Sequence, residues 1–136
     1  MFKSFQPFAD AARNAVTPSL YQLTFQNLNA SQSAQSTNVY MGYYELKSYD
    51  PASCTAICDQ TSGCVGTNLY FERNPSLLPA ARCPDPPAIT LIKCALWGSP
   101  VTPAEATNDG QYQQEFHVVI AGSNGRRKLM QDLGDL

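Results

Sequence analysis

The clearest pattern in the chain is the strict alternation of apolar and polar side chains over residues 21–26. This period is typical of a half-buried strand, and it predicts that Tyr21, Leu23 and Phe25 turn inward. Residues 27–38 follow as a run rich in Asn, Ser, Gln and Ala that has no period. We therefore interpret them as an exposed loop after the first strand.

Four further strands are predicted from apolar and aromatic runs that turn residues separate. They cover residues 39–46, 64–73, 90–97 and 111–121. Gly42 permits a bulge in the first of these strands. The third is nearly continuously apolar, which is typical of a strand in the centre of a sheet. The Gly-Ser-Asn-Gly sequence that follows the last strand is expected to close it.

One main helix is predicted between the second and third strands. Asp50 can cap its free backbone N–H groups, and Pro51 suits the first helical position because no N–H donor is needed there. Gly63 is a residue type that commonly follows a helix end, so the helix should stop just before it. The Thr-Pro-Ala-Glu sequence at 102–105 predicts a shorter helix that ends by Gly110.

The two ends of the chain carry weaker patterns. Residues 1–19 are interpreted as an N-terminal extension that can form a short amphipathic helix. One face of that helix would carry Phe2, Phe5, Ala9, Ala12 and Val16. Residues 126–136 are interpreted as a C-terminal tail, and its initial Arg-Arg-Lys run offers a cleavage site for a secretory processing protease.

The predicted elements follow the order strand, strand, helix, strand, strand, short helix, strand. Parallel βαβ units need a helix between most strand pairs, and this chain offers one long helix. We therefore expect an α+β domain over residues 20–125. Its antiparallel sheet of about five strands should have one main helix packed across it.

The composition fits a single small folded domain. The chain has 136 residues, of which 43% are hydrophobic and 15% are charged, and its net charge is −2. A disordered chain needs lower hydrophobicity with higher net charge, and no apolar run approaches the length of a membrane span. The charge balance excludes nucleic-acid binding driven by bulk electrostatics.

All five cysteines lie between Cys54 and Cys94, none of them in a C-x2-C pair, and His117 is the one histidine. Clustered thiols in a lysine-poor chain are typical of a disulfide framework in an oxidising compartment. A zinc site of four cysteines is the alternative that the count permits. Five choices of the unpaired cysteine and three pairings of the rest allow 15 schemes. Cys54 and Cys58 project from one face of the predicted helix because they are four residues apart.

Several of these elements together resemble the PAN/apple module. The matching segments are VYMGYYEL, DPASCTAICDQTSGC, CVGTNLYF and TLIKCALW, within residues 20–122. The segments LYFERNPS, IKCALWG and VVIAGSNG resemble more closely a group of secreted filamentous-fungal proteins with one or two apple-like modules. In the PAN/apple family two helix cysteines attach the helix to the sheet. The resemblance therefore implies Cys54–Cys94 and Cys58–Cys64 bridges, and it leaves Cys83 as an unpaired thiol.

The cysteine pattern and the resemblance imply a secreted or cell-wall protein. Asp10 and Arg13 interrupt the apolar stretch that a signal peptide needs, so we expect the native protein to carry a leader outside this sequence. Asn29 begins an Asn-Ala-Ser tripeptide, which is an N-glycosylation acceptor in a secreted chain. Such tripeptides also occur by chance.

Catalytic machinery is not evident in the sequence. His117 follows Phe116 in a predicted strand, where a structural role is the simpler interpretation. Cys83 is the one candidate thiol nucleophile, with Arg82 as the cation beside it. We expect a protein that is not an enzyme and uses no metal or cofactor, namely an extracellular recognition module for a glycan or protein ligand. The alternatives are a structural or adhesive module of a longer surface protein and, third, a small hydrolase.

The predicted binding surface is the loop at residues 74–87, which contains five prolines. Prolines restrict the backbone before a partner arrives, so that less entropy is lost on binding. The candidate contact residues are Arg73, Asn74, Arg82 and Asp85, and the two arginines are among the few cations of the chain. The competing interpretation is that this loop only covers an edge of the sheet.

Overall fold

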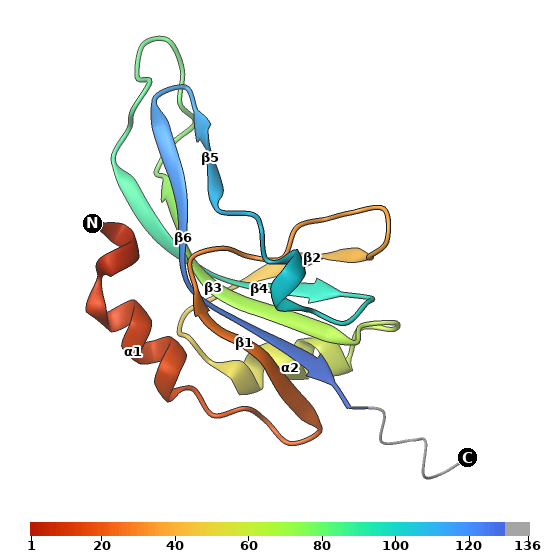
Figure 1. The fold of residues 1–136 in the computed structure, drawn as a ribbon. Coiled ribbons are helices and arrows are strands. Elements are labelled where there is room, and N and C mark those ends of the chain that lie inside the picture. Colours follow the sequence, from red (N-terminus) through yellow and green to blue (C-terminus); the bar gives the residue numbers. More distant parts are fainter. Residues whose placement is uncertain (130–136) are drawn as a thin grey trace.

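The computed structural model describes residues 1–129, which form an α+β domain around a six-stranded antiparallel sheet (Figure 1). The elements are the 3-10 turn η1 (Phe2–Ser4), α1 (Gln6–Asn14), β1 (Tyr21–Leu28), β2 (Tyr40–Leu46), α2 (Pro51–Asp59), β3 (Gly66–Pro75), β4 (Ala88–Trp97), the 3-10 turn η2 (Pro103–Glu105), β5 (Gly110–Gln113) and β6 (Phe116–Lys128). The strand order is β1-β6-β3-β4-β2, and β5 pairs with the first part of β6. The predicted α+β class and antiparallel sheet are confirmed, but the sheet has six strands instead of about five.

The sixth strand comes from a hairpin that the sequence does not signal. One strand was expected over residues 111–121, but β5 ends at Gln113 and β6 begins at Phe116. The turn holds Gln114 at φ +54°, a left-handed conformation that glycine or asparagine usually provides. Because the turn contains no residue of the usual turn-forming types, a sequence pattern does not reveal it.

The Gly-Ser-Asn-Gly sequence at 122–125 lies inside β6 instead of closing a strand. A Cβ at Gly125 would overlap the ring of Phe25 on β1, and Gly122 has φ +59° and faces the ring of Phe71. The two polar residues between these glycines are fully buried. The glycines therefore permit close packing within a strand.

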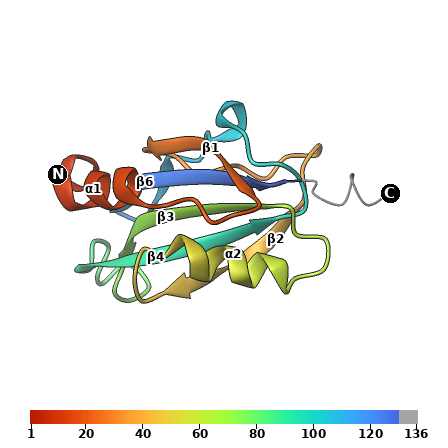
Figure 2. The same ribbon diagram turned by 90° about the horizontal axis from the view of Figure 1, so that it is seen from below.

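The main helix covers one face of the sheet (Figure 2). Its start is as predicted, because Asp50 accepts a hydrogen bond from the Ala52 N–H (3.1 Å) and Pro51 is the first helical residue. The helix ends at Asp59, earlier than expected, and the chain then turns through Gly63 at φ +86°. The second predicted helix is only the 3-10 turn η2.

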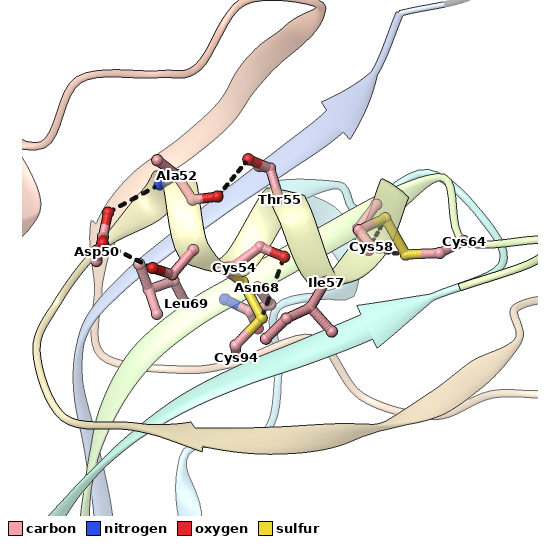
Figure 3. The surroundings of a disulfide bond; sticks show 12 residues. Asp50, Ala52, Cys54, Thr55, Ile57, Cys58, Cys64, Asn68, Leu69 and Cys94 are labelled. Carbon is pink, nitrogen blue, oxygen red and sulfur yellow. Dashed lines mark hydrogen bonds between the residues drawn. A yellow bond between two sulfur atoms is a disulfide. The ribbon is translucent and has the colours of Figure 1, made fainter. Parts of the chain in front are cut away.

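Two disulfides attach α2 to the sheet (Figure 3). Cys54 bonds to Cys94 on β4, and Cys58 bonds to Cys64 just before β3. These are the two pairs that the PAN/apple resemblance implies. Four of the five cysteines are thus joined in pairs instead of forming a zinc site, and Cys83 is a free thiol.

The N-terminal helix α1 packs on the same face. Phe8 stacks on Phe71 with 4.3 Å between the ring centroids, and Ala12 is completely buried. The predicted apolar face is wrong at Phe5 and Val16, which are exposed. A separate 3-10 turn precedes α1, and α1 ends at Asn14, so Phe5 and Val16 both lie outside the helix.

Bulges in two strands decide which face several aromatic side chains occupy. In β1 the register shifts between Leu23 and Phe25, so Phe25 packs on the face opposite the helices and Leu23 is exposed instead of inward. The bulge permitted by Gly42 is present in β2, where this residue has φ +93°. Its extra residue turns Tyr40 and Tyr43 to the same face, although they are an odd number of positions apart.

The central strand is β3, not the apolar run at 90–97. β3 pairs with β4 on one side and with β6 on the other, and it is buried over most of its length. β4 lies between β3 and the edge strand β2, and its first residues are exposed. The predicted central strand, β4, is therefore the neighbour of the actual central strand, β3.

The last strand continues through Arg126, Arg127 and Lys128, which the sequence pattern assigned to a tail. Arg126 is 1% exposed, and its Nε donates to Thr17 Oγ1 (3.1 Å). All three basic residues pair with β1. A processing protease would have to unpair the strand to cleave there. The remainder of the predicted tail, from residue 130, lies outside the described residues.

Candidate functional site

The face of the sheet opposite the helices carries a cleft of about 510 Å³. The loop after β1, the strands β2 to β4 and the segment between η2 and β5 enclose it, and Figure 1 shows both loops above the sheet. Its lining includes Ser31, Gln32, Tyr40, Tyr70, Trp97 and Asp109. This cleft is the candidate site.

Aromatic rings line the cleft where it meets the sheet. Trp97 on β4 and Tyr70 on β3 are buried in the core of this face, together with Phe25 and Ile120. Tyr40 on the edge strand β2 lies against Trp97, with 5.0 Å between the ring centroids. Because Tyr40 is 46% exposed, its ring is the aromatic surface that a ligand can contact directly.

Hydrogen bonds join the two loops that enclose the cleft. Ser31 donates its backbone N–H to the Asn108 carbonyl (2.9 Å) and accepts the Asn108 N–H in return (3.0 Å). The Asn108 side chain also donates to Ser31 Oγ (3.1 Å), and Ser33 Oγ lies 2.7 Å from Thr107 Oγ1. The expectation that the whole of residues 27–38 is exposed is therefore wrong where this loop crosses the sheet.

Gln32 connects this loop to the sheet. Its backbone N–H donates to Asn68 Oδ1 (2.8 Å), and its Oε1 accepts the backbone N–H of Thr102 (3.0 Å). Asn68 is fully buried and donates in turn to Ser123 Oγ (2.9 Å). A buried polar network therefore replaces apolar packing between the loop and the two middle strands.

Two buried N–H groups on lining residues have no acceptor within residues 1–129. They are Trp97 Nε1 and Gln32 Nε2, and neither residue is more than 4% exposed. The bond from Thr102 to Oε1 fixes the Gln32 amide in the orientation that leaves Nε2 without a partner. Unpaired buried donors are uncommon in folded proteins. Both donor atoms are also inaccessible to solvent, so they are unsatisfied groups beneath the cleft surface.

The cleft lining is almost uncharged. Among residues 1–129, Asp109 is the one acidic residue of the lining, and no Lys, Arg or His belongs to it. Burial, assisted by the negative charge of Glu72, raises the pKa of Tyr70 above its usual value, and burial likewise raises the pKa of Tyr40. Both phenols are therefore neutral hydrogen-bonding groups at physiological pH. The arrangement suits a neutral polar ligand better than an anion.

An ion pair lies farther along the same face. Lys93 on β4 pairs with Glu72 on β3, and their side chains are only 12% and 9% exposed. The Lys93 Nζ lies 4.2 Å from the centroid of the Tyr43 ring. Asn74 contributes a further hydrogen bond, from Nδ2 to Glu72 Oε1 (2.6 Å). Because Lys93 is the direct cross-strand partner of the cleft residue Tyr70, this surface adjoins the cleft.

The contact residues predicted from the sequence do not gather at the cleft. Arg73 Nη1 donates to the carbonyl of His117 (2.8 Å), and its guanidinium lies 4.4 Å from the centroid of the Phe116 ring. Asn74 is bonded to the ion pair described above, whereas Arg82 and Asp85 are exposed on the loop between β3 and β4. Ligand binding by the proline loop at residues 74–87 therefore stays a prediction.

The other residues singled out from the sequence lie away from the cleft lining. His117 stacks on Tyr112 in the β5–β6 hairpin, with 4.3 Å between ring centroids and 3° between planes. Asn29 is exposed just after β1, as an acceptor for a glycan requires. Within residues 1–129, no cluster of three or more His, Cys, Asp or Glu side chains could hold a metal. No helix in this part of the chain is long and apolar enough to cross a membrane.

Comparison with known proteins does not assign this chain to a family. No protein-family model, no curated protein and no solved structure matches it. The PAN/apple resemblance therefore stays a prediction.

Sequence reasoning missed the cleft because its lining comes from five segments that are separate in the sequence. Tyr40, Tyr70 and Trp97 lie in predicted strands, but a sequence pattern does not show which aromatic side chains share a face. The polar composition of the loop after β1 suggested solvent exposure. Its hydrogen bonds to Asn108 and Asn68, both distant in sequence, place it over the sheet instead.

Proposed function

We propose that this protein is an extracellular recognition module of the PAN/apple type, and that it binds a neutral, hydroxyl-rich glycan in the cleft. The observation that carries the proposal is the half-exposed ring of Tyr40 against Trp97, at the edge of an almost uncharged polar cleft. A sugar ring offers an apolar face for an aromatic side chain and hydroxyl groups for polar ones.

The size and lining of the cleft favour a glycan over the other candidates. A specific protein partner usually needs a contact area larger than one small cleft. A glycosidase usually needs two carboxylates beside the scissile bond, and the described part of the chain contributes one carboxylate, Asp109, to this lining. The polar groups of the lining, which include Ser33, Thr107 and Asn108, support a ligand rich in hydroxyl groups.

The proposal places the protein outside the cell or in the cell wall. The two disulfides support this location, because disulfide bonds persist in oxidising compartments and are rare in the cytosol. A direct check is the redox state of the native protein, since finding all five thiols reduced would contradict the location.

The test is an array of glycans and secreted proteins, probed with the folded domain and with two matched variants. Tyr40→Ala removes the exposed ring at the cleft. Tyr44→Ala removes a similarly exposed ring (51%) from the same strand, but its cross-strand partner Cys94 places it on the helix side. We expect glycan binding to weaken about tenfold in the first variant and to stay unchanged in the second.

The possible array results separate the candidate functions. Saturable binding of a secreted protein, without binding of any glycan, would show that the ligand is a protein. No saturable binding would favour a structural or adhesive module. Glycan binding that both tyrosine variants reduce equally would contradict the cleft as the site.

A further inference from the structure

We infer that the ligand is a chain of sugar units and that a second subsite for it lies at Tyr43, beside Lys93 and Glu72. The inference rests on the proposed function, because this subsite extends the surface that begins at the cleft. The inference specifies that the ligand is longer than one sugar unit, and it names the residues that contact the second part of the ligand.

The bulge at Gly42 gives this surface its second aromatic ring. In a regular strand, residues three positions apart point to opposite faces. Between Tyr40 and Tyr43, however, three steps along β2 correspond to two steps along β4, from Trp97 to Ala95. The positive φ of Gly42 accommodates the extra residue. Two tyrosines that are 46% and 45% exposed therefore share the cleft face.

The spacing of these two rings favours an extended ligand. Their partners on β4, Trp97 and Ala95, are two residues apart, so the two tyrosines are separated by about 7 Å along the strand, which is longer than one sugar ring. A single sugar at Tyr40 would therefore leave Tyr43 uncovered. An oligosaccharide that leaves the cleft along β2 would place successive units near both rings.

The ion pair makes the second position polar and fixed in place. Lys93 Nζ is held between the carboxylate of Glu72 and the face of the Tyr43 ring. A lysine ammonium has three donors and a carboxylate accepts several hydrogen bonds, so both groups keep capacity for ligand hydroxyls. The adjacent opposite charges nearly cancel, which keeps the surface suited to a neutral ligand.

The charged groups at the second position act electrostatically on the cleft. The charge of Glu72 raises the pKa of Tyr40 and of Tyr70, although burial is the larger cause in both. Lys93 and Tyr70 are direct cross-strand partners, so the ion pair adjoins a residue of the cleft lining. A ligand can therefore pass from one position to the other over neighbouring side chains.

The experiment measures affinity against chain length. The probes are glucose, N-acetylglucosamine and mannose, each as the free sugar and as linear oligomers of two to six units. In the unmodified domain, affinity for the series that binds should rise about tenfold between the single sugar and the tetramer. Tyr43→Ala should remove most of that rise and leave the affinity for the single sugar unchanged.

Three controls separate this inference from a loss of folding and from the proposed function. Tyr43→Phe keeps the ring over Lys93 and should preserve most of the rise, and Tyr44→Ala should preserve all of it. Thermal unfolding of each variant verifies the fold. An affinity that does not depend on chain length, or a rise that persists in folded Tyr43→Ala, would overturn the second subsite and leave the proposed function intact. If no sugar or oligomer of the array binds, the proposed function fails and this inference fails with it.

Discussion

Both faces of the sheet have an apolar core, but different interactions fix the segments that cover them. On the helix side, two disulfides and an apolar core that includes Leu69 and Leu96 fix α2 against the strands (Figure 3). On the loop side, Asn68 and Gln32 take part in a hydrogen-bond network that fixes a polar loop over the strands.

This difference explains why the cleft lies on the loop side. Apolar side chains pack to high density and leave few gaps, whereas a loop fixed by directional hydrogen bonds stays at the positions those bonds dictate. The cleft between the loops retains polar groups that a ligand can contact. The helix side therefore stabilises the fold, and the loop side carries the candidate site.

Removal of the disulfides should cause the largest change. By loop entropy, the Cys54–Cys94 bridge, with 40 residues of separation, should contribute about 4 kcal/mol to the free energy of unfolding. The Cys58–Cys64 bridge, with six, should contribute about 2 kcal/mol. Denaturant unfolding of the two double Cys→Ser variants measures both. A larger loss from the short bridge would show that helix packing, not loop entropy, sets their contributions.

Removal of one partner of the buried ion pair tests how much this pair stabilises the loop side. Glu72→Gln leaves Lys93 without its partner in a poorly solvated position, so unfolding should become easier by about 2–3 kcal/mol. Asp59→Asn alters the more exposed pair with Lys128 at the edge of the helix side, and its effect should stay below about 1 kcal/mol. Chemical denaturation compares the two, and equal losses would contradict the assigned difference in burial.

Gly125→Ala tests the close contact between β6 and β1. The new methyl group would overlap the Phe25 ring, so we expect a loss of about 1–2 kcal/mol in stability. A second substitution, Phe25→Leu, should recover part of this loss by making room. Thermal unfolding of the single and double variants tests this coupling, and purely additive losses would show that the contact is not the cause.

The smallest expected effect is the pH dependence at Asp59. Burial acts to raise the pKa of this carboxyl, but hydrogen bonds from Tyr21 (2.7 Å) and Lys128 (3.1 Å) outweigh burial and leave the pKa below its usual value. Its stabilising contribution should therefore be complete above the unfolded-state pKa of about 4. It should disappear as the pH falls through the lower pKa of the folded state.

The measurement is the stability difference between the unmodified protein and Asp59→Asn, followed from pH 7 to pH 2. The difference should shrink in acid. A difference that grows in acid would reverse the sign of the assigned pKa shift.

Part of the difference between the two faces could be predicted from the sequence. Asp50 and Pro51 mark the start of α2 because capping depends on neighbouring residues alone. The spacing of Cys54 and Cys58 places both on one side of that helix. The resemblance to a known module, more than any pattern, indicated their partners. These features concern mainly the helix side.

The arrangement of side chains on the loop side, in contrast, depends on contacts between segments that are distant in the sequence. A bulge moves Phe25 to the loop side, another places Tyr43 beside Tyr40, and Gln114 forms a turn that carries no usual turn residue. The sequence by itself determined the strands β1 to β4, the main helix and the chemistry of their residues, because those follow from local periods and local hydrogen bonds. Only the tertiary structure decided which side chains share a face, because each strand's register is set by the strand beside it.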